Sequence, residues 1–222
     1  MTLPPRAVLT SAQAIAIAAA TLLVFCGFST AIAIWGINGP TVIDAGWAEL
    51  MRGIQIPPLT ALSLALNVIG GTIASGLIAP VIVAGVSLVR HRLWAAGFLI
   101  AASVVSAAAV KLVKVTFARP RPEDMMIVSD FGSFPSGHSA NAAVIAIVLC
   151  LLFPRQRWLP YVSGAYVLLM MWSRTYLQAH WLTDTVAGVL LGTTAALLIW
   201  AGFRTHVIRE AQSPALQRST HT

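Results

Sequence analysis

The stretch LWAAGFLIAASVVSAAAVKLVKVTFARPRP, residues 93–122, decides how this chain folds. Its first part is apolar, and it is long enough to cross the hydrocarbon core of a membrane, which takes about 20 residues of helix. Its last nine residues, from Lys114 onward, include three cations. Cationic side chains that follow an apolar run are expected at the membrane surface. The stretch therefore predicts a transmembrane helix over 93–113 that ends in a positively charged site.

The rest of the chain repeats this pattern of apolar runs. Of the 222 residues, 58% are hydrophobic and 9% are charged, whereas soluble domains carry about 25% charged residues. A soluble fold of this composition would expose large apolar patches. We therefore expect an all-α, polytopic membrane protein, a bundle of six transmembrane helices. The predicted spans are 12–35, 60–89, 93–113, 138–153, 158–176 and 181–203.

The segments between and after the spans are short. Residues 36–58 carry several charges and predict an exposed loop with a short amphipathic helix. We expect one domain over 1–203, followed by a polar, disordered tail over 204–222. Six spans bring both termini to one side, and the bias of Lys and Arg predicts that this side is cytoplasmic. The net charge of +7 does not indicate nucleic acid, because the chain lacks a basic stripe interleaved with exposed aromatics.

Almost every unusual polar residue falls in one of three clusters. In an alternating bundle, the ends of the third and fifth spans share a membrane face with the starts of the fourth and sixth. Topology alone therefore predicts that the clusters meet on one face, which we expect to be the outer one. The clusters are residues 114–122, residues 134–138 (FPSGH), and the set Ser173, Arg174, His180 and Asp184.

The cations and the helix start indicate a phosphate site. Guanidinium groups match phosphate oxygens bidentately, and a lysine adds a point charge. At the start of a helix, unpaired N–H groups and the helix dipole favour an anion. The predicted phosphate-binding residues on these grounds are Lys114, Arg121, Ser136, Gly137 and Arg174.

The two histidines suit covalent phosphoryl transfer. His180 and Asp184 lie four residues apart and share a helix face. A carboxylate in that position can keep one imidazole nitrogen protonated and leave the other free to attack. His138 comes from a different helix and can act as the general acid for the leaving oxygen.

Simpler structural roles remain open for several of these residues. Lys114 and Arg119 can anchor a helix end by extending to the membrane surface, and Asp184 can cap the sixth helix. Gly188 and Gly192 form a small-xxx-small step typical of helix packing. The acidic residues in the loop between the first two clusters are expected to be solvated and not metal ligands; they are Glu123, Asp124 and Asp130.

Together the clusters resemble the signature of the type-2 phosphatidic-acid phosphatase and vanadium haloperoxidase superfamily. That signature has a Lys followed after six residues by Arg-Pro, then Pro-Ser-Gly-His, then Ser-Arg followed by His and Asp; here it occupies a core of about residues 111–192. The resemblance implies that His180 forms a phosphohistidine, that Asp184 orients it, and that His138 protonates the leaving group. It also implies catalysis without a metal and phosphate binding by Lys114, Arg121, Ser136, Gly137, Ser173 and Arg174.

The same resemblance implies an integral membrane lipid phosphatase that needs no cofactor. Members of the membrane branch act on lipid phosphates, so we expect a substrate of the undecaprenyl pyrophosphate, phosphatidic acid or phosphatidylglycerol phosphate type. The expected partners are this lipid and the bilayer, and no nucleic acid. Two alternatives stay open: phosphoryl transfer to another lipid from the same site, and anion binding by a transporter without turnover. A transporter would be expected to show repeats with broken helices, which the sequence lacks.

Overall fold

The computed structural model describes residues 8–70 and 92–212, and within these ranges every regular element is a helix. This confirms the predicted all-α fold class. The helices of the described ranges are α1 (Ser11–Trp35), α2 (Val42–Gly53), α3 (Pro57–Gly70), α5 (Leu93–Phe117), α6 (Gly137–Leu152), α7 (Leu159–Tyr176) and α8 (Leu182–Ala211).

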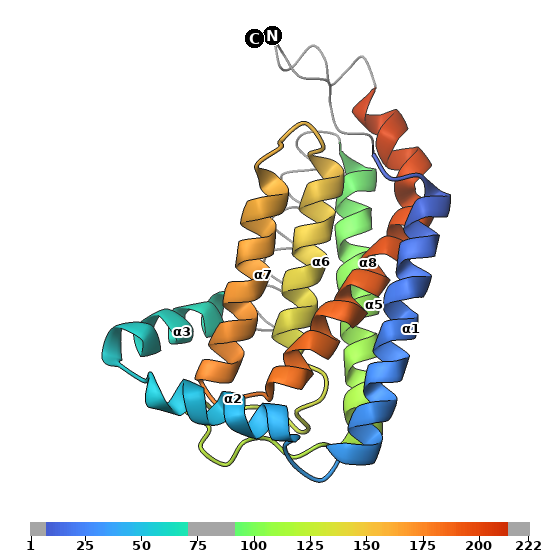
Figure 1. Ribbon diagram of the computed structural model, residues 1–222. Helices are drawn as coiled ribbons and strands as arrows, with labels where there is room; N and C mark the ends of the chain where they lie inside the picture. The colour runs from blue at the N-terminus through green and yellow to red at the C-terminus, as the bar shows by residue number, and fades with distance from the viewer. Residues whose placement is uncertain (1–7, 71–91, 213–222) are drawn as a thin grey trace.

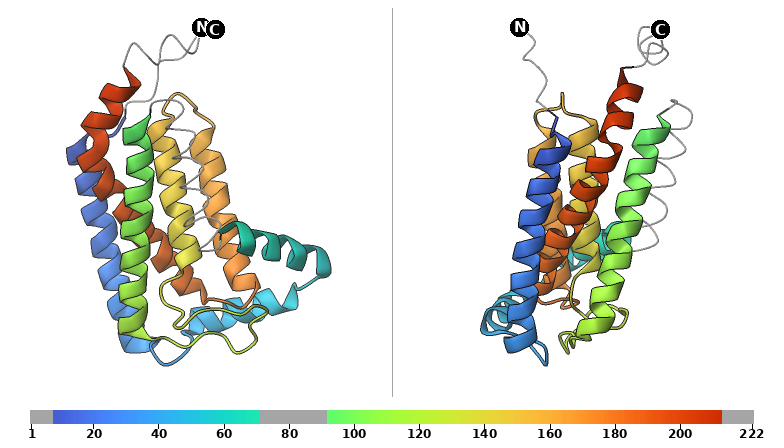
Figure 2. Two further views of the ribbon diagram at one scale, coloured as in Figure 1. Left: turned by 180° about the vertical axis from the view of Figure 1, so that it is seen from behind. Right: turned by 90° about the vertical axis from the view of Figure 1, so that its right-hand side faces the viewer.

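Five of the helices, α1, α5, α6, α7 and α8, run up and down side by side, while α2 lies across one end of the bundle (Figure 1). We call this the α2 end. The views in Figure 2 show that α3 leaves the bundle at an angle and that α8 crosses obliquely between its neighbours. α8 packs against α1, α5 and α6. The ends of α5 and α7 meet the starts of α6 and α8 at the α2 end, as the alternation predicts.

The outer surface of the bundle is apolar. α1, α5 and α8 are long and apolar enough to cross a membrane, and α3 and α6 are shorter apolar helices. The predicted spans 12–35 and 158–176 agree with α1 and α7 to within one residue at each end. The predicted span 60–89 begins within α3, and its part beyond residue 70 lies outside the described residues. Together these features make the chain a polytopic membrane protein.

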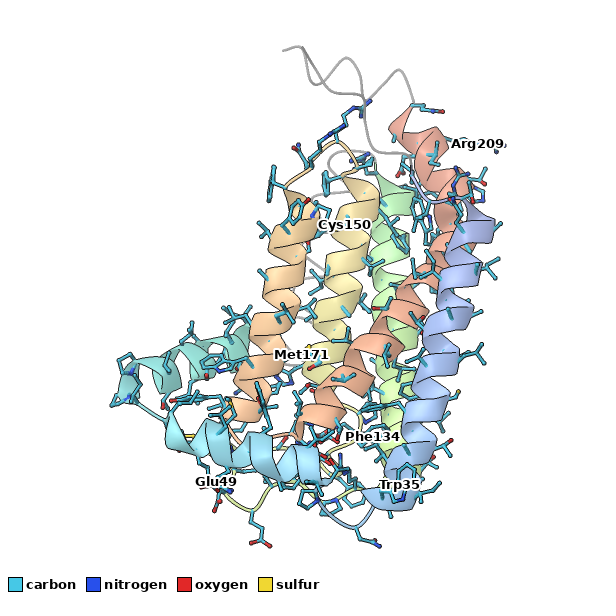
Figure 3. The ribbon with its side chains drawn as sticks, viewed as in Figure 1. Trp35, Glu49, Phe134, Cys150, Met171 and Arg209 are labelled. Atoms are coloured by element: carbon cyan, nitrogen blue, oxygen red, sulfur yellow. The ribbon has the colours of Figure 1, made fainter. Side chains whose placement is uncertain are left out.

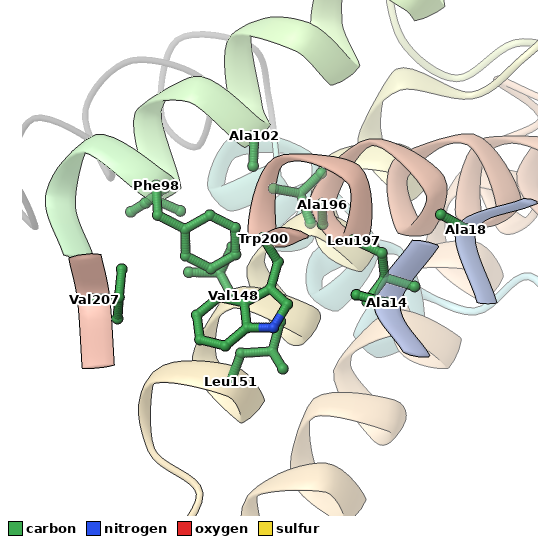
Figure 4. Close-up of a cluster of buried hydrophobic side chains, with 12 residues drawn as sticks. Ala14, Ala18, Phe98, Ala102, Val148, Leu151, Ala196, Leu197, Trp200 and Val207 are labelled. Carbon is green, nitrogen blue, oxygen red and sulfur yellow. The ribbon is translucent and has the colours of Figure 1, made fainter. Parts of the chain in front are cut away.

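An aromatic core holds the bundle together away from the α2 end. Trp200 of α8 is fully buried, and its ring lies 5.3 Å from that of Phe98 on α5. Val148 of α6 completes this contact, and the small residues Ala14 and Ala18 let α1 approach α8 closely (Figure 4). Burial of these side chains ties four helices into one unit.

Two glycines let α8 touch α6 at the backbone. A Cβ on Gly188 would overlap the carbonyl oxygen of Ser136, and one on Gly192 would overlap the carbonyl of Ala140. Only a residue without a side chain fits at these two points. The packing role predicted for the small-xxx-small step is therefore confirmed.

Two segments outside the spans can be compared with expectation. The predicted short amphipathic helix within 36–58 is α2, and it begins with a capping box in which Thr41 and Asp44 bond to each other's backbone N–H. The disordered tail expected from residue 204 is wrong for residues 204–211, because α8 continues to Ala211. The reason is tertiary: the Glu210 carboxylate accepts the backbone N–H groups of Trp94 and Ala95 at the start of α5.

Candidate active site

A cavity of about 620 Å³ is lined by α3, α5, α6 and α7 and by the loops that precede α6 and α8. Figure 3 shows Phe134 at the α2 end of α6 and Cys150 toward the opposite end, so α6 begins at the α2 end. The cavity brings together residues from all three sequence clusters. The predicted site residues that line it are Lys114, Gly137, His138, Arg174 and His180.

The other predicted residues lie around this lining. Arg121 contacts it directly, because its Nη1 is 3.2 Å from Nε2 of His180. Ser136 caps α6 and accepts hydrogen bonds from Ser139. Ser173 donates its hydroxyl to the carbonyl of Ser63 on α3 at 3.1 Å. Ser136 and Ser173 thus bond to protein groups, and neither lines the cavity.

His180 is held in the turn between α7 and α8. The carbonyl of Arg174 accepts the N–H groups of Ala179 and His180, which closes the turn. Nδ1 of His180 lies 2.8 Å from the carbonyl of Ser133. Because a carbonyl only accepts, Nδ1 must carry the proton, and Nε2 keeps its lone pair.

Burial keeps this imidazole neutral. Desolvation, and after it the positive charge of Arg121 and Lys114, lowers the pKa of His180 well below its ordinary value of 6.5. A neutral imidazole whose Nε2 keeps its lone pair is the nucleophilic form of histidine.

Asp184 lies behind His180 but is not its nearest partner. Oδ2 of Asp184 is 3.6 Å from Nδ1 of His180 and accepts the backbone N–H of Trp181 at 2.9 Å. The carboxylate therefore caps α8 while it stands beside the histidine, so the capping role is confirmed. Nδ1–H of His180 donates its hydrogen bond to the Ser133 carbonyl and not to the expected carboxylate of Asp184. A backbone carbonyl leaves no signal in the sequence.

Arg119 does not extend to the membrane surface, so its interpretation as an interfacial anchor is wrong. Its side chain is 0% exposed and lies between two buried carboxylates. Nη1 is 2.6 Å from Oδ1 of Asp184, and Nη2 is 2.7 Å from Oδ2 of Asp44. Its Nε donates to the carbonyl of Gly36 at 2.7 Å. Paired in this way, the guanidinium can stay charged in the interior.

Asp44 connects α2 to the start of α8. It accepts the N–H of Thr183 at 2.9 Å and the Thr183 hydroxyl at 2.8 Å. Burial alone would raise the pKa of Asp44, but these bonds and the Arg119 guanidinium hold it below its ordinary value. The chain Asp44–Arg119–Asp184 thus fixes the carboxylate next to His180.

The cation on α7 has unused hydrogen-bonding capacity. Arg174 is 1% exposed and lines the cavity. Its Nη1 donates to Oδ1 of Asn67 at 2.6 Å. Its Nε and Nη2 are buried and have no hydrogen-bond partner within the described part of the chain. A buried guanidinium in this condition is suited to an oxyanion.

The other two cations share one carboxylate. Nζ of Lys114 lies 2.9 Å from Oδ1 of Asp130, and Nη2 of Arg121 lies 2.6 Å from the same oxygen. The Asp130 side chain is 69% exposed, so it is solvated as expected, but it is also ion-paired. A carboxylate oxygen thus lies where the two cations could hold a phosphate oxygen.

His138 lies in the first turn of α6 and lines the cavity. Its Nε2 is 3.3 Å from the backbone carbonyl of Asn67 on α3. α3 carries no part of the three clusters, and a lone Asn in an apolar helix gave no spacing signal. In the described ranges, no group of three or more His, Cys, Asp or Glu residues could hold a metal ion.

Comparisons with known proteins match the chain to one family model and to several relatives. The family model described as "PAP2 superfamily" matches residues 92–208. The chain is 35% identical over 98 residues to phosphatidylglycerophosphatase B of Bacillus subtilis, covering 40% of this chain and 48% of that protein. It is 38% identical over 66 residues to inositol phosphorylceramide synthase of Candida albicans, covering 29% of this chain and 13% of that protein. The chain thus spans less than half the length of these relatives.

A solved structure shares the fold. The transmembrane PAP2-type phosphatidylglycerolphosphate phosphatase of Bacillus subtilis superposes with a TM-score of 0.75 at 22% identity. The superposition covers 85% of this chain and 96% of that one.

Proposed function

Because the chain belongs to the PAP2 superfamily, we propose that it is an integral membrane lipid phosphatase that removes phosphate from a phosphomonoester or pyrophosphate headgroup. The observation that carries this proposal is Arg174. Its buried guanidinium has two nitrogens without a partner in the described ranges, in a cavity that two histidines also line. Such an arrangement suits a substrate that brings both a negative charge and an electrophilic phosphorus.

In the first step, Nε2 of His180 attacks phosphorus and the bond from phosphorus to the leaving oxygen breaks. His138 gives its proton to that oxygen, so that the oxygen of the lipid alcohol or lipid phosphate is protonated as it leaves. Lys114, Arg121 and Arg174 hold the other phosphoryl oxygens and balance their charge in the transition state. For this, Arg121 exchanges its contact with Nε2 of His180 for the phosphate.

In the second step, water attacks the phosphohistidine. His138, now neutral, accepts a proton from this water, and the bond between phosphorus and Nε2 breaks to release inorganic phosphate. Nδ1 of His180 keeps its proton, hydrogen-bonded to the Ser133 carbonyl, through both steps. Asp184 stabilises the positive charge that develops on the imidazole. Neither of these two steps requires a metal ion.

The shape of the cavity favours an amphiphile. It extends along α5 from Lys114 to Ser103, which is about 16 Å at 1.5 Å per residue. Lys111 and Lys114 stand at one end of this wall, and the α5 residues that line it between Lys111 and Ser103 are mostly apolar. A glycerolipid phosphate or a polyprenyl pyrophosphate fits this distribution, with the headgroup at the α2 end. We further propose that the α2 end faces outward, with both termini cytoplasmic.

The test is phosphate release by the purified protein in detergent. A panel of undecaprenyl pyrophosphate, phosphatidic acid, phosphatidylglycerol phosphate and a water-soluble phosphate ester is assayed with and without EDTA. We expect release from lipids that EDTA does not prevent, and no release by His180→Ala. The matched control is His206→Ala, because His206 stacks on Trp94 near the end of α8, away from the cavity. Full activity of His180→Ala would overturn the mechanism.

Phosphoryl transfer to a second lipid is the alternative. The relative from Candida albicans is named a synthase, and a phosphohistidine can react with an alcohol as well as with water. Mass spectrometry of the products in the presence of lipid alcohols separates the two reactions. A phosphorylated acceptor would favour transfer, and inorganic phosphate alone favours hydrolysis.

A further inference from the structure

One face of α3 is fitted to the phosphate site. The carbonyl of Ser63 accepts the Ser173 hydroxyl, and Leu66 packs against Met170 of α7. At Gly70, a Cβ would overlap the side chain of Met170. Residues 63, 66, 67 and 70 recur at helical spacing and so share one face. This face holds α3 against α6 and α7.

Asn67, on this face, contacts two groups of the site. Its side-chain oxygen accepts Nη1 of Arg174 at 2.6 Å, and its backbone carbonyl lies 3.3 Å from Nε2 of His138. The oxygen of the amide must face the arginine, because a guanidinium only donates. Asn67 also lines the cavity.

We propose that Asn67 is a positioning residue for the phosphate site. By binding Nη1, it fixes the plane of the Arg174 guanidinium and leaves Nε and Nη2 for the substrate oxygens. It lies outside the residues that the family model matches, 92–208. The inference rests on the proposed function only in that it takes the cavity to bind phosphate.

The amide suits this task because it is neutral. A carboxylate at position 67 would bind Arg174 as firmly but would neutralise its charge and repel a phosphate. An alanine would leave Nη1 without its partner, so that the guanidinium is free to turn. Anion binding and stability should therefore respond differently to these two substitutions.

The experiment compares Asn67→Ala and Asn67→Asp in the full-length protein in detergent. Affinity for inorganic phosphate is measured by isothermal titration calorimetry and thermal stability by tryptophan fluorescence. We expect Asn67→Ala to weaken phosphate binding about tenfold, and Asn67→Asp to weaken it more. Asn67→Asp should nevertheless melt no lower than Asn67→Ala, because its carboxylate keeps the bond to Arg174.

If Asn67 had a purely structural role, the variant with the higher melting temperature would also bind phosphate more tightly. The matched control is Ser63→Ala, because the Ser63 hydroxyl is buried on the same face without a hydrogen-bond partner among the described residues. It should bind phosphate within about twofold of the unmodified protein. If Asn67→Ala does not fold, Asn67→Asp alone still tests the proposal. Phosphate binding by Asn67→Asp as tight as that of the unmodified protein would overturn it.

Failure of this inference is distinguishable from failure of the proposed function. If the unmodified protein releases phosphate from lipids but both Asn67 variants bind phosphate normally, the positioning role alone is overturned. If the unmodified protein binds phosphate but releases none from any lipid, hydrolysis is overturned, and the order of the two affinities still tests Asn67.

Discussion

Replacement of Arg119 by methionine should destabilise the protein strongly, because it leaves two buried carboxylates without their cation. Arg119, Asp44 and Asp184 are each 0% exposed. Removing one partner of a buried ion pair costs about 3–5 kcal/mol. A stranded carboxylate can avoid this cost only by taking up a proton. For a carboxyl with an ordinary pKa of about 3.9, protonation at about pH 7.5 costs about 5 kcal/mol, so the destabilisation stays in the same range.

The assay is thermal unfolding in detergent, followed by tryptophan fluorescence. In a chain of this size each kcal/mol shifts the melting temperature by about 2–4 °C, so Arg119→Met should melt about 6–20 °C lower. The loss should shrink as the pH is lowered toward about 5.5. Without its cation, Asp44 would have a raised pKa, so the folded variant binds more protons than the unfolded chain and loses stability as pH rises.

Two further variants make the result specific. Arg119→Met combined with Asp44→Asn removes one of the stranded charges and should recover several degrees. Arg52→Met is the control, because Arg52 also pairs with two carboxylates, Glu49 and Asp124, but in contact with water. Its melting temperature should change little. A melting temperature of Arg119→Met within about 2 °C of the unmodified protein would refute the account of Arg119 as a buried charged link.

Three other variants test the remaining features. In the unmodified protein the pKa of His180 is lowered, so the unfolded chain takes up this proton at a higher pH than the folded chain does. The free energy of unfolding should therefore fall by about 1.4 kcal/mol per pH unit below about pH 6.5. His180→Gln should remove this dependence on pH. Melting curves at several pH values check this, and parallel curves for the two proteins would contradict it. Asp130→Asn should tighten phosphate binding about two- to fivefold, because the Asp130 carboxylate no longer competes with phosphate for Lys114 and Arg121. Calorimetry measures the affinity, and weaker binding by the variant would contradict this competition. Gly192→Ala should lower the free energy of unfolding by about 1–3 kcal/mol, because its methyl group overlaps α6. Gly164→Ala is the control, since a Cβ there has nothing within 4 Å. Equal melting temperatures of the two variants would show that α6 and α8 separate easily.

Local patterns in the sequence predict the five helices of the bundle, except for the end of α8, and the meeting of the clusters. Apolar runs located α1 and α7 to within a residue, because a membrane-spanning segment must satisfy its own backbone and be apolar along its length. Alternation of direction then brought Lys114, His138 and His180 to one cavity. None of these inferences needs knowledge of which side chains touch.

The partners of the site residues could not be predicted in this way. Asn67 and Asp44 lie in segments without a motif, and they reach Arg174 and Arg119 only because α3 and α2 dock at the same end of the bundle. The Ser133 carbonyl that holds His180 is a backbone group, which any residue would provide. Such contacts depend on the tertiary arrangement, and no local spacing encodes it.

The close approach of α8 to α6 has a consequence for how the cavity can change its width. His138 lies in the first turn of α6, and His180 lies two residues before the start of α8, so the two imidazoles are carried by helices whose main chains touch at Gly188 and Gly192. Because these main chains are already in contact, we expect the distance between the two imidazoles to stay constant. If the cavity takes up a bulky lipid tail, as the proposed function requires, we expect it to widen at the wall that α5 and the last turn of α3 form.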